Sequence, residues 1–236
     1  MPNINHNTNN NQLTVAKFGG TSVADFDAML RCAHIIKNDS ANRVVVVSAS
    51  AGVTNHLVRL SQASVPAFEQ ADIIDKIKTI QVNITQHLSN ALALNDMINE
   101  RLTALAEIAQ IQSKNHSSKI TDAILSFGEQ LSSLLFAEVL QSIDLPGKAF
   151  DVRQIMKTNS LYGKAAVDIE QLQACSEISL KSLLTNNIIV TQGFIGQDSL
   201  GHTTTLGRGG SDYSAALIAE AICATNLSIW TDVVGI

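Results

Sequence analysis

A glycine turn between two apolar runs is the feature that most constrains the fold of this chain. The β-branched run QLTVAKF (12–18) stops at Gly19-Gly20 and predicts a strand. Residues 24–38 follow with apolar side chains at helical spacing, and RVVVVSAS (43–50) is almost continuously apolar. Such a run is typical of a strand that is covered on both faces. Strand, helix and buried strand in this order predict a βαβ unit and therefore a parallel sheet.

The rest of the chain continues this pattern around a long helical insertion. Residues 66–143 contain no comparable strand run, and their periodicity predicts helices, the last of them over 120–143. After the insertion the pattern predicts strands over 147–152, 187–196 and 227–233, with helices around 168–184 and over 213–225. One α/β domain with a mostly parallel sheet and an inserted helical lobe fits this order.

Composition excludes several function classes. The 236 residues carry a net charge of −5 and contain no basic run, so we expect no nucleic-acid partner. The cysteines (Cys32, Cys175 and Cys223) form no C-x-x-C pair, which argues against zinc and for a reducing compartment. The asparagine-rich residues 1–12 predict a disordered tail, not a signal peptide, and no run approaches the length of a membrane span. We therefore expect a cytoplasmic protein without a membrane partner.

The C-terminal residues DVVGI (232–236) come directly after the last predicted strand, without a polar tail. A parallel sheet of this kind is expected to continue, so the domain over 13–236 is predicted to be truncated.

KFGGTS (17–22) has the composition of an anion-binding turn. Ligands of parallel sheets bind at the carboxyl ends of the strands, where glycines let backbone N–H groups approach an anion closely. Lys17 precedes Gly19 and Gly20, whereas the lysine of the common phosphate loop follows its glycines. Lys17 would add a point charge to the same anion from the strand side. Taken alone, however, the pattern favours an ordinary tight turn beside a solvated lysine.

LGRGGSD (206–212) is a stronger signal, because glycines surround Arg208 just before a predicted helix. Ser211 or Asp212 is the expected N-cap of that helix. The glycines leave a concave backbone, and the guanidinium is a planar fork that matches a carboxylate or a phosphate. A surface ion pair of Arg208, with Asp212 as a simple cap, explains the pattern equally well.

Glu129 interrupts an otherwise apolar helix in FGEQLSSLLF (127–136). Burying a carboxylate there is costly unless the carboxylate meets a cation. The side chain could face solvent, and a ligand ammonium would explain it as well.

Several segments occur in the order and spacing found in aspartokinases, and the chain resembles that family from about Val15 to its last residue. These segments are KFGGTSVADFDAM, VVVVSASAGVTN, FGEQLSSLLF, VTQGFIG, TTTLGRGGSDYSAALIAEA and IWTDVVGI. The resemblance is greatest to the monofunctional, lysine-sensitive aspartokinases of bacteria.

This resemblance implies the amino acid kinase fold, a three-layer αβα sandwich. It implies transfer of the γ-phosphoryl group of ATP to the β-carboxylate of L-aspartate, the first step toward lysine, threonine and methionine. Mg²⁺ would be carried by the nucleotide, without a metal site on the protein itself. The full-length enzyme is expected to be a homo-oligomer.

The resemblance also assigns roles to individual residues. It assigns nucleotide binding to Lys17, Phe18, Gly19, Gly20, Thr231 and Asp232, aspartate binding to Thr54, Glu129, Arg208, Gly209, Gly210 and Ser211, and catalysis to Lys17 and Asp212. Arg208 would then clamp the α-carboxylate and Glu129 the α-ammonium, while Asp212 orients Lys17. No general base is needed, because the β-carboxylate has an ordinary pKa of about 3.9 and is already ionised at neutral pH.

Two departures from the family and two alternatives remain. The chain has neither the further nucleotide contacts nor the regulatory ACT domains that follow in the family, and Val234 stands where Asp or Pro is expected. One alternative is a kinase for glutamate, N-acetylglutamate or carbamate; Glu129 with Arg208 instead favours a substrate that has both a free amine and an α-carboxylate. The other is an inactive fragment that folds and binds aspartate, or dimerises, without turnover.

Overall fold

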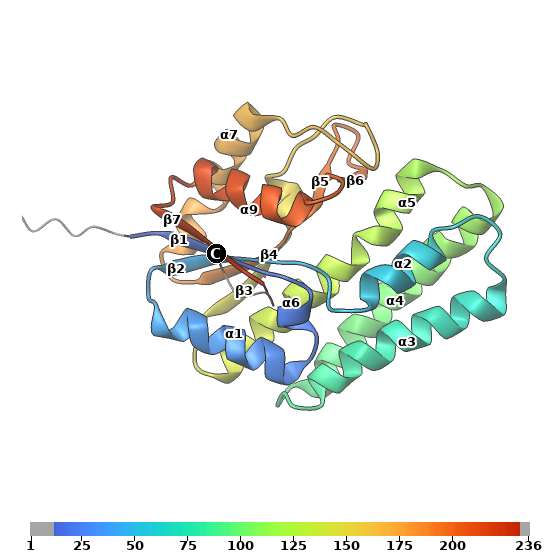
Figure 1. Ribbon diagram of the computed structural model, residues 1–236, viewed down its shortest axis with the longest axis horizontal. Helices are drawn as coiled ribbons and strands as arrows, with labels where there is room; N and C mark the ends of the chain where they lie inside the picture. The colour runs from blue at the N-terminus through green and yellow to red at the C-terminus, as the bar shows by residue number, and fades with distance from the viewer. Residues whose placement is uncertain (1–11, 232–236) are drawn as a thin grey trace, which may run out of the picture.

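The computed structural model describes residues 12–231, and its centre is a five-stranded sheet (Figure 1). The strands are β1 (Thr14–Phe18), β2 (Asn42–Val47), β3 (Gly147–Phe150), β4 (Ile188–Gln192) and β7 (Asn226–Trp230), in the order β3-β4-β2-β1-β7. Each neighbouring pair is parallel, which confirms the parallel sheet expected from the sequence. The predicted tail, apart from Gln12, and residues 232–236, with Asp232 and Val234 among them, lie outside the described residues.

Helices cover both faces of the sheet (Figure 1). One face carries α1 (Phe26–Asn38) and α6 (Phe127–Ser142), and the other carries α7 (Ile169–Ser179), α8 (Lys181–Leu184) and α9 (Gly210–Ala221). Successive side chains of β2 point to opposite faces of the sheet, so this strand contributes to the hydrophobic core on each face. Val45 and Val47 pack in the core with α1 and α6, and Val44 and Val46 pack in the core with α7 and α9. The near-continuous apolar run thus serves two faces, and the three-layer αβα prediction is confirmed.

The helical insertion forms a lobe beside the sheet (Figure 1). It consists of α2 (Val53–Leu60), α3 (Ala67–Thr85), α4 (Ala91–Lys114) and α5 (Ser118–Leu125), which pack on one another and on α6. Apolar side chains of the lobe belong to the same core as those of α1 and α6. Lobe and sheet are therefore joined through one continuous core.

The helix expected over 120–143 is in fact two helices, α5 and α6, which meet at Ser126. Ser126 Oγ donates to the carbonyl of Ala123 at 2.7 Å, and this local bond competes with regular helical bonding. The N-cap of α5 is Ser117, whose Oγ accepts from the Ile120 N–H at 3.2 Å.

Together α5 and α6 form a 25-residue stretch, Ser118–Ser142, that is long and apolar enough to cross a membrane. The expectation that no run approaches such a length is therefore wrong. Its most apolar window has a mean hydropathy of 1.3, but 78% of that window is buried inside the protein. The stretch is a largely buried helical element of the core.

The strand expected over 187–196 is also interrupted, because β4 ends and the chain turns at Gly193 and Phe194. Phe194 has a positive φ of 69°, a conformation that bulky residues rarely adopt. The chain then enters an antiparallel hairpin of β5 (Ile195–Gln197) and β6 (Thr203–Thr205). The turn 206–212 consequently follows this hairpin and not a strand of the parallel sheet. Two short 3-10 helices, η1 (Thr21–Val23) and η2 (Val152–Gln154), complete the described elements.

Candidate functional site

A cleft of about 500 Å³ opens at the carboxyl end of the sheet, between the helical lobe and the start of α9. Most residues that the sequence assigned to a site line it, namely Lys17, Thr54, Glu129, Arg208, Gly209, Gly210, Ser211 and Asp212. Folding thus brings together residues that are far apart in the chain. Phe18, Gly19 and Gly20 are not part of the lining.

Lys17 and Asp212 form an ion pair at this cleft. Val15 packs in the core beneath α9, so Lys17, two residues further along β1, projects toward the same helix. Its Nζ lies 2.6 Å from Oδ1 of Asp212, in the first turn of α9. The lysine side chain is 10% exposed and the aspartate side chain 51% exposed, so the ammonium lies on the inner side of the pair. An ammonium has three donors, and two remain for a ligand.

Gly19 and Gly20 have packing roles that the sequence did not reveal. The Gly19 N–H donates to the carbonyl of Trp230 at 3.3 Å and joins this turn to β7. A Cβ on Gly20 would lie 2.7 Å from the carbonyl oxygen of Ala49, so the turns after β1 and β2 touch only because Gly20 lacks one. Within residues 12–231 the Gly20 N–H has no acceptor, and it is the amide of this pair that remains for an anion.

The side chain of Phe18 is buried in the core. Its ring centroid lies 5.7 Å from that of Phe136 and 6.3 Å from that of Trp230. Only its backbone reaches the strand-end turns, where its carbonyl accepts from the Ser48 N–H at 3.2 Å. Thr231 follows Trp230, the residue that pairs with Phe18 in the sheet.

Glu129 is buried in the first turn of α6, which excludes the solvent-facing alternative. Its Oε1 accepts one hydrogen bond, from the Ala49 N–H at 3.2 Å. Burial raises the pKa of the Glu129 carboxyl to about 7, against the opposing effect of that bond. No cation among residues 12–231 pairs with it, so the ammonium that a buried carboxylate needs would have to come from a ligand.

Gly128 allows α6 to approach the turn after β2. Alanine normally stabilises a helix by about 1 kcal/mol relative to glycine. A Cβ at Gly128 would, however, lie 2.6 Å from Cβ of Ala49 and 3.2 Å from Cδ1 of Leu57. We therefore expect Gly128→Ala to lower the free energy of unfolding by about 1–3 kcal/mol, measured by urea denaturation. Adding Ala49→Gly should recover much of this loss; an undiminished stability of Gly128→Ala would contradict the tight packing.

The raised pKa of Glu129 predicts a pH dependence of stability. The carboxyl titrates near 4.5 when unfolded and at about 7 when folded, so between these values the folded chain binds the extra proton. Stability conferred by this group is therefore complete below the lower value and falls as the pH rises through the window. We expect Glu129→Gln to match the unsubstituted chain near pH 4.5 but to exceed it by about 2–4 kcal/mol above pH 7. Parallel urea-unfolding profiles for the two proteins across this range would refute the shift.

Arg208 is exposed and has no ion-pair partner among residues 12–231, whereas Arg153 forms an ion pair with Asp151. Gly207 and Gly209 on either side of it have positive φ values of 80° and 75°, which glycine adopts without strain. A Cβ on Gly210 would lie 2.9 Å from the ring of Phe194. The glycines thus hold the arginine at the rim of the cleft with its fork free for an anion.

The start of α9 differs from the expected one. The helix begins at Gly210 with Gly209 as its N-cap, and no side chain caps it. The expectation that Ser211 or Asp212 is the cap is therefore wrong. Asp212 pairs with Lys17 instead, and Gly193 packs so closely on Ser211 that a Cβ on that glycine would lie 2.7 Å from the serine Cβ.

Asp122 also lines the cleft, and the sequence analysis missed it. It lies in α5, is 1% exposed, and accepts hydrogen bonds from the Gly163 N–H, the Thr205 N–H and the Thr205 hydroxyl. Burial raises the pKa of its carboxyl, while these bonds act in the opposite direction. The available signal was a charged residue in a mostly apolar helix, the same signal that singled out Glu129.

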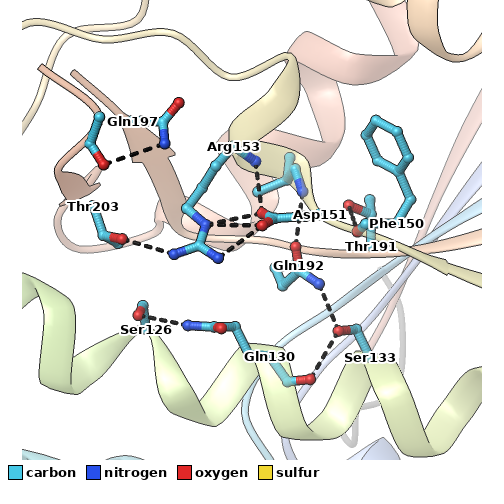
Figure 2. A network of polar contacts seen from close by, with 12 residues as sticks. Ser126, Gln130, Ser133, Phe150, Asp151, Arg153, Thr191, Gln192, Gln197 and Thr203 are labelled. Atoms are coloured by element: carbon cyan, nitrogen blue, oxygen red, sulfur yellow. Dashed lines mark hydrogen bonds and ion pairs between the residues drawn. The ribbon is translucent and has the colours of Figure 1, made fainter. Parts of the chain in front are cut away.

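A buried polar network fixes α6 to the carboxyl end of β4 (Figure 2). Gln192 donates to Oγ of Ser133 at 2.7 Å and accepts from the Val152 N–H at 2.8 Å. Arg153, in η2, donates to Oγ1 of Thr203 in β6 at 2.9 Å. The network therefore joins the helix that carries Glu129 to the hairpin that leads to the arginine turn.

The comparisons with known proteins fit this geometry. Residues 12–236 match the amino acid kinase family. The chain belongs to this family. It is 46% identical over 228 residues to lysine-sensitive aspartokinase 3 of Escherichia coli (strain K12), covering 95% of this chain and 50% of that protein. It is 36% identical over 223 residues to an aspartokinase of Chlamydia trachomatis (serovar D), covering 94% and 49%.

The three-dimensional structure also matches that of a solved member of the amino acid kinase family. A crystal structure of E. coli aspartokinase III in complex with aspartate and ADP (R-state) superposes with a TM-score of 0.92 and 45% identity, covering 95% of this chain and 50% of that chain. The chain therefore spans about half the length of these relatives, all of which are aspartokinases, and the family resemblance found in the sequence is confirmed. Within residues 12–231, no group of three or more His, Cys, Asp or Glu side chains is arranged to hold a metal ion.

Proposed function

We propose that this chain carries the aspartate-binding and phosphoryl-transfer centre of an aspartokinase. One observation carries the proposal: within residues 12–231, the cleft combines a buried carboxylate that has no cation partner, an exposed arginine that has no anion partner, and a lysine at a strand end. L-Aspartate has the complementary groups, one ammonium and two carboxylates. The relative of E. coli was crystallised with aspartate and ADP, which supports both substrates.

Recognition of aspartate would use the two unpaired groups. Glu129 would accept the α-ammonium and Arg208 would clamp the α-carboxylate with its two parallel donors, with the hydroxyls of Thr54 and Ser211 at the same cleft. A bound cation favours the ionised form of Glu129, so aspartate binding would release a proton near neutral pH. Fixing both α-groups would leave the β-carboxylate free to point toward Lys17.

Phosphoryl transfer would depend on charge neutralisation and alignment rather than on a general base. The product would be 4-phospho-L-aspartate. Lys17 would bind the oxygens of the transferring group, while Asp212 holds its ammonium in place. The free Gly20 N–H would contribute from the adjoining turn. Mg²⁺ would accompany the nucleotide and neutralise its phosphate oxygens.

Other amino acid kinase substrates fit the cleft less well. N-Acetylglutamate and carbamate lack the free α-ammonium and would leave Glu129 buried without a cation, at a cost of several kcal/mol or a raised pKa. Glutamate has all three charged groups but is one methylene longer, a difference worth about 1–3 kcal/mol in a fitted site. Aspartate is therefore the favoured substrate.

The setting of the reaction follows from the same proposal. The product would enter lysine (through diaminopimelate), threonine and methionine synthesis in the cytoplasm, and the free cysteines among the described residues suit a reducing compartment. A homo-oligomer remains the expectation for the complete enzyme.

Titration of the chain with L-aspartate in a calorimeter tests the proposal, with circular dichroism to establish folding. We expect L-aspartate to bind at least tenfold more tightly than L-glutamate or N-acetyl-L-aspartate, since each lacks one feature of the fit. ADP release upon addition of MgATP then measures turnover. A folded chain that binds no aspartate would overturn the proposal, and selective binding without turnover would favour the inactive-fragment alternative.

A further inference from the structure

We propose that Asp122 is a positioning residue that holds the turn carrying Arg208 in its substrate-binding geometry. This inference rests on the proposed function, in which Arg208 clamps the α-carboxylate of aspartate. Asp122 belongs to α5 in the helical lobe, whereas the turn follows β6 on the opposite side of the cleft. The carboxylate is thus a link between the two walls of the site.

The link consists of three hydrogen bonds to two separate segments. Oδ2 of Asp122 accepts from the Gly163 N–H at 2.9 Å and from the Thr205 N–H at 2.8 Å. Oδ1 accepts from the Thr205 hydroxyl at 2.9 Å. One carboxylate therefore binds the loop before α7 and the last residue of β6 at the same time.

These two segments determine where the arginine turn lies. Thr205 stands three residues before Arg208, and its carbonyl accepts from the Ala165 N–H at 2.9 Å, so a second hydrogen bond joins the loop to β6. A Cβ on Gly207 would lie 3.0 Å from the Gly163 carbonyl oxygen, which places the turn directly against the loop. Displacing either segment would therefore displace the arginine.

Asp122 is suited to this role and not to contact with the substrate. Both of its oxygens are engaged by protein donors and its side chain is buried. Glu129 in the same cleft accepts a single bond, from the backbone of Ala49, and keeps acceptor capacity for a ligand. Asp122 thus holds two segments of the protein together, whereas Glu129 is available to the ammonium of the substrate.

The test compares Asp122→Ala with Asp122→Asn and with the control Gln112→Ala. Gln112 is also buried and makes hydrogen bonds to Ser61, Ser117 and Thr121, so it holds the start of α5 without reaching β6. We expect Asp122→Ala to raise the Kd for L-aspartate roughly 10- to 100-fold, because a displacement of about 1 Å has such an effect. The KM for ATP and the kcat at saturating aspartate should change less than about threefold. Gln112→Ala should lower the thermal stability without changing the Kd for aspartate.

Asp122→Asn separates positioning from direct contact. Its amide oxygen can replace Oδ2 for both backbone donors, and its amide nitrogen can donate to the Thr205 hydroxyl. We expect this variant to retain a Kd within about threefold of the unsubstituted chain. A Kd as poor as that of Asp122→Ala would mean that the charge itself acts on the substrate, and would overturn the inference.

A double-mutant cycle and amide exchange complete the test. The double variant Asp122→Ala/Arg208→Ala should have a Kd for aspartate within about twofold of that of Arg208→Ala alone, since Asp122 acts through the arginine; full additivity would overturn the inference. Hydrogen exchange of residues 203–210 should accelerate in Asp122→Ala and not in Gln112→Ala. This readout needs no ligand. If the unsubstituted chain fails to bind aspartate, the proposed function fails, while unchanged exchange in Asp122→Ala would separately overturn the positioning role.

Discussion

We expect Lys17→Ala to lower kcat for aspartate phosphorylation roughly 1,000-fold or more, as removal of a preorganised charge from a transition state does. The Kd for L-aspartate should change less than about threefold, because the groups that bind its α-ammonium and α-carboxylate are untouched. The measurement is a steady-state assay of ADP release, combined with a calorimetric titration of aspartate.

The size of this effect follows from the environment of Lys17. The reaction brings an anionic β-carboxylate toward an anionic phosphoryl group, and charge neutralisation supplies most of the catalysis. The Lys17 ammonium lies on the inner side of its pair with Asp212, where little water screens it. Removing the ammonium also leaves the Asp212 carboxylate unpaired next to the incoming phosphate, so a repulsion is added to the lost attraction.

Two controls separate charge from packing. Lys17→Met keeps an unbranched apolar stem in the same place and should lose as much kcat as Lys17→Ala. Lys37→Ala removes an exposed lysine of α1 whose ammonium donates to the carbonyl of Ile143 at the end of α6, and it should leave kcat unchanged. Retention of kcat within about tenfold in Lys17→Ala would remove this lysine from the mechanism.

The layers of the fold were predictable because their signals are local. The run 43–50 has apolar residues at both odd and even positions, and these pack in the cores on the two faces of the sheet. Interruptions of elements were not predictable, because they depend on distant partners. Gly193 ends the run 187–196 where the chain must pass the first turn of α9, and nothing near it in sequence reports that approach. The hydrogen bond of Ser126 likewise divides one apolar stretch into two helices.

In the site, likewise, individual residues could be predicted from the sequence but their interaction partners could not. Arg208 and Glu129 were identified from residue type and pattern, since each is unusual in its segment. What the pattern could not reveal is the partner of each group: Asp212 was expected as a helix cap and instead pairs with Lys17. Asp122 was missed because its partners follow it by some forty to eighty residues, in segments without any distinctive motif.

Arg208→Ala is expected to raise the Kd for L-aspartate about 100-fold, which corresponds to the roughly 2–3 kcal/mol of a charge-assisted bidentate hydrogen bond. The arginine is exposed at the rim and lacks an ion-pair partner among the described residues, so truncation leaves no buried protein anion behind. Its loss should therefore appear in ligand affinity and not in the free energy of unfolding. Arg208→Lys should recover little, because an ammonium cannot form the parallel pair of bonds.

A ligand that lacks the α-carboxylate identifies which group the arginine binds. The α-amide of L-aspartate keeps the ammonium and the β-carboxylate, so the unsubstituted chain should bind it about 100-fold more weakly than L-aspartate. In Arg208→Ala the two ligands should bind within about threefold of each other, since the discriminating contact is gone. Discrimination that survives the substitution would assign the α-carboxylate to another residue.

Lys164→Ala distinguishes a specific clamp from general attraction of an anionic ligand. Lys164 is an exposed cation that adjoins Gly163 and packs near Gly207, so it contributes positive charge at the same rim without a fork to match a carboxylate. We expect its removal to change the Kd for aspartate less than about twofold and to act mainly on the association rate at low salt. An equal loss of affinity in Lys164→Ala and Arg208→Ala would mean that the rim attracts aspartate by its net charge. The larger and salt-resistant loss expected for Arg208→Ala instead requires a geometric fit, which the positive-φ glycines on either side of the arginine make available.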